Sequence, residues 1–398
     1  METKILRWMA GTALCGIAAC AHAQSSVTLY GIVDNGLQYE TGLPGGNRLS
    51  AESGGWGESR FGMLGNEDLG GGLHTTFRLE ARLNTLNGSV ANGSFFEGQA
   101  TVGLRHDAYG AIRLGNFGAS ELLQDSGELD PQQTKKYSFG TLVRGRMFPQ
   151  ASNGIEYTSP DFGGFTVKGQ YNLTNSTKWN AGSPGTAPGQ LGTATGLGSA
   201  QGRADGLKLQ YKASNLEAQL IYDEIRDGNG KFSNVYLASR SIFAGASYGV
   251  GPVTLYAGYV HLSAPDASNA GYYGTGTPSA QPAGVSLPTA VDQEWFGAQW
   301  AVTPATAIMG AVYHANANHG NGNGTLYTLS GIYSLSKQTR LYTELGYLRN
   351  SATSNLGLNG GTYGANNVND PVNGSASNLN PGYGRSQFGV FAGIATQF

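Results

Sequence analysis

The sequence has 398 residues and a formal charge of −2, so no basic excess indicates nucleic acid binding. Its 63 glycines are about twice the usual share, and 39% hydrophobic residues is low for a globular chain of this length. Beyond the N-terminal segment no apolar run approaches the ~20 residues of a membrane-spanning helix. A closed β-barrel escapes that requirement, because each strand needs only every second residue to be apolar.

Residues 1–23 are interpreted as a secretory signal peptide. Two basic residues precede a short apolar run, and Ala21-His22-Ala23 offers small residues for cleavage. A lipoprotein-type cut before Cys20 is the alternative, but cleavage after Ala23 leads directly into a strand. Both cysteines, Cys15 and Cys20, lie in this segment. The mature chain of 398 − 23 = 375 residues, with 22 basic and 25 acidic side chains, therefore has no disulfide and no thiolate metal ligand.

The mature chain opens with the period-two patterning typical of strands. In Ser26–Glu40 one face carries Val27, Leu29 and Val33, and the other carries Thr28, Tyr30 and Asp34. In Leu73–Thr85 the face opposite the apolar one carries His74, Thr76, Arg78, Glu80 and Arg82. This pattern fits a barrel with lipid outside and water inside. A soluble sandwich with its faces exchanged would show the same alternation.

The connections between the predicted strands alternate between short and long. The tight turns are Glu67–Gly72, Asp107–Gly110, Ser159–Gly164, Ser214-Asn215, Gly249–Pro252, Thr303–Ala305 and Ser336–Thr339. The long connections are Thr41–Glu58, Leu86–Ser94, Gly118–Ser152, Thr174–Ala204, Arg226–Asn234, Ser263–Thr289, Asn316–Asn323 and Ser351–Gly384. Short turns on one side and long loops on the other are typical of an outer-membrane barrel. Fifteen connections join sixteen strands, which would enclose an aqueous channel.

The third long connection, 118–152, has its charges sorted along the chain. Four acids, Glu121, Asp125, Glu128 and Asp130, precede four bases, Lys135, Lys136, Arg144 and Arg146. A structureless connection of this length inside a compact domain is usually functional. Two interpretations stay open from these residues alone. The segment either folds into the barrel lumen and narrows it, or it is an exposed surface loop.

The last predicted strand, Arg385–Phe398, ends on an aromatic residue. Its alternating face is Phe388, Val390, Ala392, Ile394 and Thr396, and Phe398 closes the chain. We interpret Phe398 as an assembly signal, through which the last strand is handed to the barrel-assembly machinery.

Three patterns resemble catalytic or metal sites. Gly245–Gly249 spells G-x-S-x-G, but a second alternating strand follows where a hydrolase has a helix, so catalysis by Ser247 is disfavoured. His314 and His319 have no cysteine or carboxylate close by, and a solvated pair is the simpler interpretation. The acids of 118–152 could bind Ca²⁺ but lack the EF-hand spacing. We expect no enzyme activity, no cofactor and no metal.

Over essentially all of 24–398 the chain resembles the general porins of Gram-negative outer membranes. The resemblance is carried by SSVTLYGIVD, SRFGMLGNEDLGGGL, FFEGQATVGL, SNGIEYTSPDFGGF, GASYGVGPVTLYAGY, YSLSKQTRLY and the final Phe398. It implies an all-β, transmembrane, 16-stranded antiparallel barrel whose long third loop folds inward. It also implies a homotrimer in the outer membrane, in contact with its lipid and lipopolysaccharide. The partners implied are small hydrophilic solutes and ions, not nucleic acid.

By this resemblance the functional site is a pore constriction. Its predicted members are Arg60, Arg78, Glu80, Arg82 and Arg113 on the wall and Glu121, Asp125, Glu128, Asp130, Arg144 and Arg146 on the loop. Leu64, Gly98 and Asn116 stand where the family commonly has basic residues, so the basic wall is only partly kept. We expect diffusion limited by size and by a transverse field, with a weak anion preference. The alternative is a barrel that serves as scaffold for an adhesin or a hydrolase, which a structured catalytic dyad would favour.

Overall fold

The computed structural model describes 26–43, 45–90, 95–118, 121–133, 135–143, 146, 152–172, 203–227, 230–236, 238–267, 282–359 and 381–398. The predicted signal peptide and Arg144 lie outside these ranges, as does the side chain of Glu121. No helix within the described ranges is long and apolar enough to cross a membrane.

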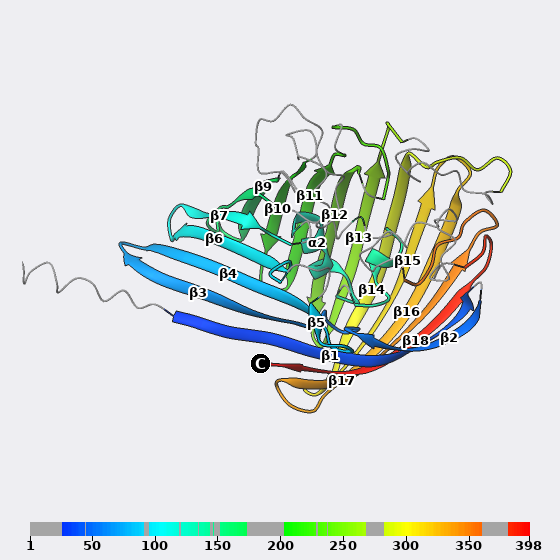
Figure 1. Cartoon of the computed structure of the whole chain (residues 1–398), viewed down its shortest axis with the longest axis horizontal. Coiled ribbons are helices and arrows are strands. Elements are labelled where there is room, and N and C mark those ends of the chain that lie inside the picture. Colours follow the sequence, from blue (N-terminus) through cyan, green and yellow to red (C-terminus); the bar gives the residue numbers. More distant parts are fainter. Residues whose placement is uncertain are drawn as a thin grey trace, which may run out of the picture.

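The described chain is almost entirely antiparallel sheet, wrapped around a few short helices (Figure 1). The strands are β1 (Ser26–Leu43), β2 (Gly46–Ser53), β3 (Arg60–Gly70), β4 (Leu73–Asn84), β5 (Ser89–Val90), β6 (Gln99–His106), β7 (Gly110–Asn116), β8 (Gly154–Thr158), β9 (Phe165–Asn172), β10 (Ala204–Lys212), β11 (Leu216–Ile225), β12 (Arg240–Val250), β13 (Val253–Ser263), β14 (Ala290–Thr303), β15 (Thr306–Ala317), β16 (Gly322–Ser334), β17 (Thr339–Asn350) and β18 (Gln387–Gln397). With the exception of β2 and β5, consecutive strands pair with one another. Ile32–Glu40 of β1 pairs with Gly389–Gln397 of β18, which closes the barrel.

The closed barrel has sixteen strands, as the connection pattern predicts. The sheet counts eighteen elements, but β2 continues β3 along the same edge of β1, and β5 is a two-residue extension beside β4, so 18 − 2 = 16. The seven tight turns fall where they were expected.

Two connections differ from the sequence-based assignment. Half of Thr41–Glu58 is strand β2, because the outer half of β1 needs a backbone partner after β3 ends, and β2 supplies it from Asn35 to Leu43. The connection predicted at Asn316–Asn323 is a tight turn, since β15 and β16 pair as far as Ala317 and Gly322.

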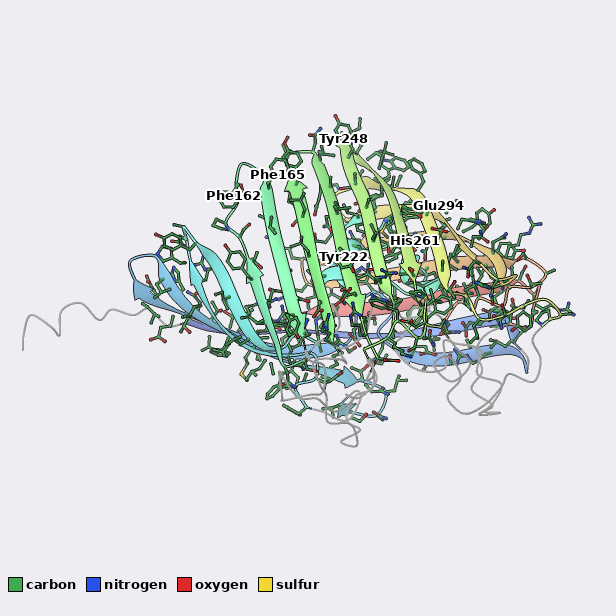
Figure 2. The ribbon with its side chains drawn as sticks, turned by 90° about the horizontal axis from the view of Figure 1, so that it is seen from above. Phe162, Phe165, Tyr222, Tyr248, His261 and Glu294 are labelled. Carbon is green, nitrogen blue, oxygen red and sulfur yellow. The ribbon has the colours of Figure 1, made fainter. Side chains whose placement is uncertain are left out.

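The two faces of the barrel wall differ in polarity as the alternation predicts. Directly paired residues share a face, and Tyr222 and Ile242 are 40% and 49% exposed on the outside. The adjacent pair along the two strands, Asp223 and Ser241, has its side chains on the inner face, where they are 1% and 0% exposed. Figure 2 shows the outward side of this wall, with Phe162, Phe165 and Tyr248 towards the turn end of the strands. The exterior therefore presents an apolar band to lipid, and polar side chains face the lumen.

This assignment of faces predicts opposite outcomes for neighbouring substitutions. Leu220 is 51% exposed on the outside of β11, so Leu220→Arg should cost about 2–4 kcal/mol near the middle of the bilayer. Gln210 on β10 faces the lumen, where its amide contacts Glu128 and Glu217, and Gln210→Arg should insert normally. Urea unfolding of the refolded variants in lipid vesicles measures both effects. Equal destabilisation would mean that the faces are exchanged.

Candidate functional site

The described part of the long loop 118–152 lies inside the barrel. Its described parts are α2 (Glu121–Asp125), η2 (Ser126–Leu129), η3 (Phe139–Thr141) and the turns that join them. On β14 the Trp295 Nε1–H donates to the Leu129 carbonyl at 3.0 Å, and the Gln293 amide donates to the Phe139 carbonyl at 2.8 Å. Trp295 and Gln293 are buried, whereas Phe296, which follows Trp295 on the opposite face of β14, is 62% exposed on the outside. Because the loop contacts the inward side chains, it occupies the lumen.

Further contacts attach the loop to distant parts of the wall. Gln132 donates to the Thr328 hydroxyl at 2.9 Å and accepts from the Ser330 hydroxyl at 2.6 Å, both on β16. The Tyr137 hydroxyl accepts from the Gln38 amide of β1 at 3.2 Å. A Cβ at Gly389 of β18 would lie 2.4 Å from the Tyr137 hydroxyl, so glycine makes room for this ring. The loop therefore crosses the lumen from β11 to β1.

Two predicted loop members hold the loop in place instead of facing the channel. Arg146 is fully buried, and its Nη2 lies 2.7 Å from the Asp223 carboxylate of β11 while its Nε donates to Ser239 at 2.8 Å. Asp130 is also fully buried and accepts from the Tyr313 hydroxyl of β15. Breaking such a buried charged contact from one side is costly, so both residues fix the position of the loop.

The wall left uncovered by these loop contacts carries the predicted arginines. Glu80 of β4 lies 2.8 Å from Arg78 Nη2 and 3.5 Å from Arg60 Nε, and it accepts from the Tyr30 hydroxyl at 2.9 Å. Arg82 Nε lies 3.0 Å from the Glu58 carboxylate. Three guanidinium groups on β3 and β4 thus share two carboxylates.

The same row of charges continues onto β7 and β8. Arg113 donates to Glu156 at 2.7 Å, and Gln170 donates to the other oxygen of Glu156 at 2.6 Å. The Arg113 guanidinium lies 5.2 Å from the centre of the Phe117 ring, at the start of the long loop. This geometry fixes the guanidinium against the wall.

The loop acids contact lysines and glutamines of the wall, not the arginines that the sequence suggested as their partners. Asp125 accepts from Lys168 at 3.0 Å and from Lys208 at 2.5 Å, and these two lysines are direct partners on β9 and β10. The Glu128 carboxylate accepts from Gln219 at 2.9 Å. Loss of water around the Glu128 carboxyl, and then its hydrogen bond with Glu217, raise the pKa of Glu128.

These contacts define a lumenal charge cluster with an excess of bases. It comprises Arg60, Arg78, Arg82, Arg113, Lys168 and Lys208 against Glu58, Glu80, Glu156 and Asp125, so its net charge is 6 − 4 = +2. Nearer the turn end, Glu128, Glu217 and Lys212 together carry −1 when both acids are ionised. A positive balance remains after both groups are added.

Comparison with known proteins identifies the family to which a chain with this lumenal site belongs. A family model described as Gram-negative porin matches residues 10–353, well over half of the chain. The chain is a Gram-negative porin.

The porin has curated relatives of nearly its whole length. It is 27% identical over 384 residues to an outer membrane porin protein of Bordetella pertussis, covering 86% of this chain and 94% of the relative. It is 28% identical over 365 residues to outer membrane porin protein 32 of Delftia acidovorans, covering 87% and 90%. Among solved structures, an anion-selective porin from Comamonas acidovorans matches with a TM-score of 0.71 and 25% identity, covering 94% of this chain and 100% of that one. The porin is thus an outer-membrane protein, and its water-filled channel passes small hydrophilic solutes and ions.

The departures from the family's basic pattern have local structural consequences in this porin. Leu64 is 41% exposed and pairs directly with Arg78, so an apolar side chain faces the lumen there. Asn116 donates to the carbonyls of Phe96 and Glu97 at 3.3 and 3.2 Å. A Cβ at Gly98 would lie 2.9 Å from the Glu80 carbonyl. The last two positions therefore shape the wall beside Glu80.

Sequence reasoning missed Lys168, Lys208, Glu58 and Glu156 as members of the cluster. Lys168 and Lys208 occupy inward positions of strands with period-two alternation, and that alternation could have indicated that both side chains face the lumen. What the sequence could not show is that they are direct partners facing Asp125 of a loop more than forty residues earlier.

The motifs weighed against the channel interpretation are explained locally. Ser247 lies within β12 and pairs with Tyr256 in a hairpin. His314 lies 2.8 Å from the Thr325 hydroxyl and His319 lies 3.2 Å from the Thr289 hydroxyl. Across the described ranges no three His, Cys, Asp or Glu side chains gather into a possible metal site.

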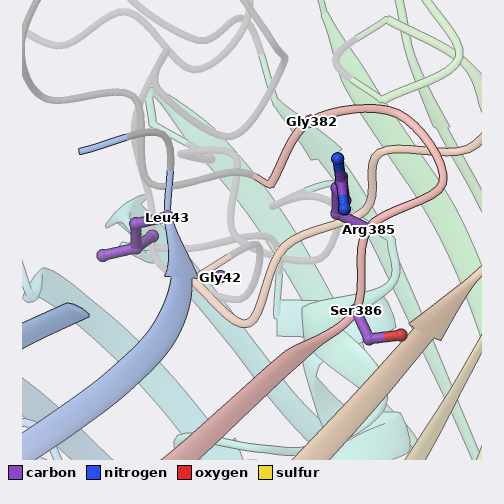
Figure 3. Close-up of a pocket in the computed structure, with 5 residues that line it drawn as sticks. All are labelled: Gly42, Leu43, Gly382, Arg385 and Ser386. Carbon is purple, nitrogen blue, oxygen red and sulfur yellow. The ribbon is translucent and has the colours of Figure 1, made fainter. Parts of the chain in front are cut away.

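A pocket of about 560 Å³ opens near the loop ends of β1 and β18 (Figure 3). Gly42, Leu43, Gly382, Arg385 and Ser386 line it. None of these residues belongs to the lumenal charge cluster, and we assign the pocket no part in solute passage.

Proposed function

We propose that the loop 118–152 and the lumenal charge cluster form the constriction of the porin and give it a mild anion preference. The observation that carries this proposal is the cluster's balance of six bases against four acids. A few side chains set ion preference in a narrow pore with walls of low dielectric constant. The solved anion-selective relative, at 25% identity, agrees with this sign.

The mechanism would combine size exclusion with a local field. The described part of the loop contacts the lumenal side of β11, β14, β15, β16 and β1. The passage would run along β3, β4 and β7, past Arg60, Arg78 and Arg113. Because Lys168 and Lys208 neutralise Asp125, the loop acids offset the wall arginines only in part. An entering anion would exchange some of its hydration for guanidinium contacts, while a cation would meet like charge.

The zero-current potential of the wild-type trimer in a planar bilayer tests this proposal. With a tenfold KCl gradient at pH 7, the sign should indicate that chloride is the more permeant ion. A sign that favours potassium would contradict the charge balance.

The anion preference should weaken at high pH through Lys135 of the loop. Burial lowers the pKa of Lys135 from its usual value to about 8, although the Glu344 carboxylate acts in the opposite direction. Lys135 is charged at pH 7 and largely neutral at pH 9.5, so the zero-current potential should move towards cation selectivity between these values. Lys135→Arg keeps its charge across this range and should show a smaller movement. An equal movement in both proteins would assign the titration to other groups.

We further propose a homotrimer, cleavage of residues 1–23, and contact with lipopolysaccharide and with the barrel-assembly machinery. The contacts of Phe398 support the last point, because its amide donates to the Gly31 carbonyl at 3.1 Å and its carbonyl accepts from Gly31 at 3.0 Å, at the closing seam. We propose that the porin has no catalytic activity. The scaffold alternative lacks support from Ser247, the one nucleophile singled out in the sequence, because β13 follows it in a hairpin where a hydrolase has a helix.

A further inference from the structure

The outward face of β10, β11 and β12 carries a cluster of ionised groups just beyond the apolar band. Asp205, Glu224 and Arg240 are neighbours across the three strands, and the next outward row towards the turns is Leu207, Tyr222 and Ile242. Those three side chains are 55%, 40% and 49% exposed, as expected at the edge of a lipid-facing surface. Figure 2 shows Tyr222 on this wall. Arg203 and Arg226 flank the row at the loop ends of their strands, and the five charged residues are termed the rim cluster.

Two of the three guanidinium groups of the rim cluster gather on one aromatic ring. Arg226 Nε donates to Glu224 at 2.9 Å, and Arg203 lies 3.5 Å from the same carboxylate and also pairs with Asp205. Arg226 and Arg240 both lie over the ring of Phe232, at 4.3 and 5.0 Å from its centre. Three arginines against two acids leave a net charge of 3 − 2 = +1.

Arg240 has no counterion in the described part of the chain. Its Nε is buried without a hydrogen-bond partner, and no carboxylate of the described residues lies within 4.0 Å of it. The two acids of the adjacent loop are used by the backbone, since Asp227 accepts from the Lys231 amide at 3.0 Å and Asp266 from the Phe232 amide at 3.1 Å. Two guanidinium groups gathered on one ring, one of them unpaired, would be stabilised by an external anion between them.

We propose that the rim cluster binds a phosphate group of a phosphorylated outer-leaflet lipid of the lipid A type, with Arg226 and Arg240 as its main ligands. The position selects this partner, because lipid phosphates lie just beyond the apolar band, at the end of the barrel with the long extracellular loops. The neighbouring outward cluster on β13 and β14 is a poor site for phosphate. There His261 and Tyr259 contact Asp292 at 2.7 and 2.5 Å, and Glu294 adds a second negative charge. The inference rests on the proposed contact with lipopolysaccharide, to which it gives a site, and it is independent of the proposed anion preference.

Binding of bisphosphoryl lipid A to the purified full-length mature trimer in phosphatidylcholine nanodiscs tests the proposal. Loss of each arginine that binds the phosphate should weaken binding about fivefold, so Arg226→Gln with Arg240→Gln should weaken it about 25-fold. Arg349→Gln is the matched control, because Arg349 is also exposed on the outside, one step beyond Tyr347 on β17. Arg240→Lys should retain most of the binding.

Further measurements separate recognition of the lipid phosphate from binding of free phosphate and from binding of the lipid chains. The dephosphorylated form of the same lipid should bind the wild type weakly, and millimolar inorganic phosphate should not displace lipid A. Single-channel conductance of the double variant should match the wild type, which shows that the barrel is folded. Any one of four results would overturn the proposal. They are an unchanged lipid A affinity in the double variant, an equal loss of affinity in Arg349→Gln, an equal affinity for the dephosphorylated lipid, and full displacement of lipid A by phosphate. None of these outcomes alters the zero-current potential, so failure here is distinct from failure of the proposed function.

Discussion

Deleting Ser126–Ser138 is expected to raise the single-channel conductance and the size cutoff of the porin while leaving its ion preference nearly unchanged. The deletion removes η2 and the contacts of Leu129, Gln132 and Tyr137 that hold the loop across the lumen. It removes two acids and two bases, Glu128, Asp130, Lys135 and Lys136, so the formal charge of the channel does not change. Size and selectivity should therefore separate in this variant.

Conductance in 1 M KCl and the uptake rates of sugars of increasing size by liposomes measure the two effects. Wild-type conductance and cutoff in the Ser126–Ser138 deletion would place the segment outside the solute path.

Removing Phe398 is expected to reduce outer-membrane assembly far more than it reduces the stability of the assembled barrel. The two backbone hydrogen bonds between Phe398 and Gly31 contribute about 1 kcal/mol each, which is small for a sixteen-strand barrel. The ring itself is 50% exposed and lies over Gly31 on the outside of the closing seam. An assembly signal would need this accessible aromatic ring, so its loss should lower the yield of heat-modifiable trimer severalfold.

Two substitutions separate the contribution of the Phe398 ring from that of its backbone hydrogen bonds. Phe398→Ala keeps both backbone hydrogen bonds and removes the ring, and it should fail in cells almost as severely as the deletion. Phe398→Tyr should assemble normally. Refolding in vitro should succeed for all three variants. Normal yields of trimer from Phe398→Ala in cells would show that the ring carries no signal.

The strands could be predicted from the sequence because alternation is a local property. Each lipid-facing side chain had to be apolar and each short turn had to be compact, so the sixteen strands and seven turns follow from residues such as Val27, Leu29 and Phe77. The strand β2 was not predicted, because Gly46–Ser53 has little apolar alternation. Its pairing is required by the exposed edge of β1, which is a property of the assembled sheet.

The site was less predictable, because the roles of its charges depend on contacts distant in sequence. Arg146 and Arg60 are alike in sequence terms, yet Arg146 is fully buried against Asp223 while Arg60 lies half-buried beside Glu80. The resemblance to the family gave the loop its place in the lumen, and only the fold gave Asp125 its lysine partners. Glu121 and Arg144 remain predictions, since their side chains lie outside the described residues.

Replacing Arg60, Arg78 and Arg82 together by Gln tests the central claim most directly. The lumenal charge cluster would change from +2 to 3 − 4 = −1, so the sign of its field should reverse. Replacing all three by Lys keeps the charge, and replacing Lys231, Lys337 and Arg349 by Gln removes three exposed charges elsewhere, which salt screens beyond ~10 Å at 0.1 M. The zero-current potential in a tenfold KCl gradient should move from chloride towards potassium selectivity only in the first variant. An unchanged potential in that variant, with trimer yield and conductance retained, would contradict the proposal that these arginines set ion preference.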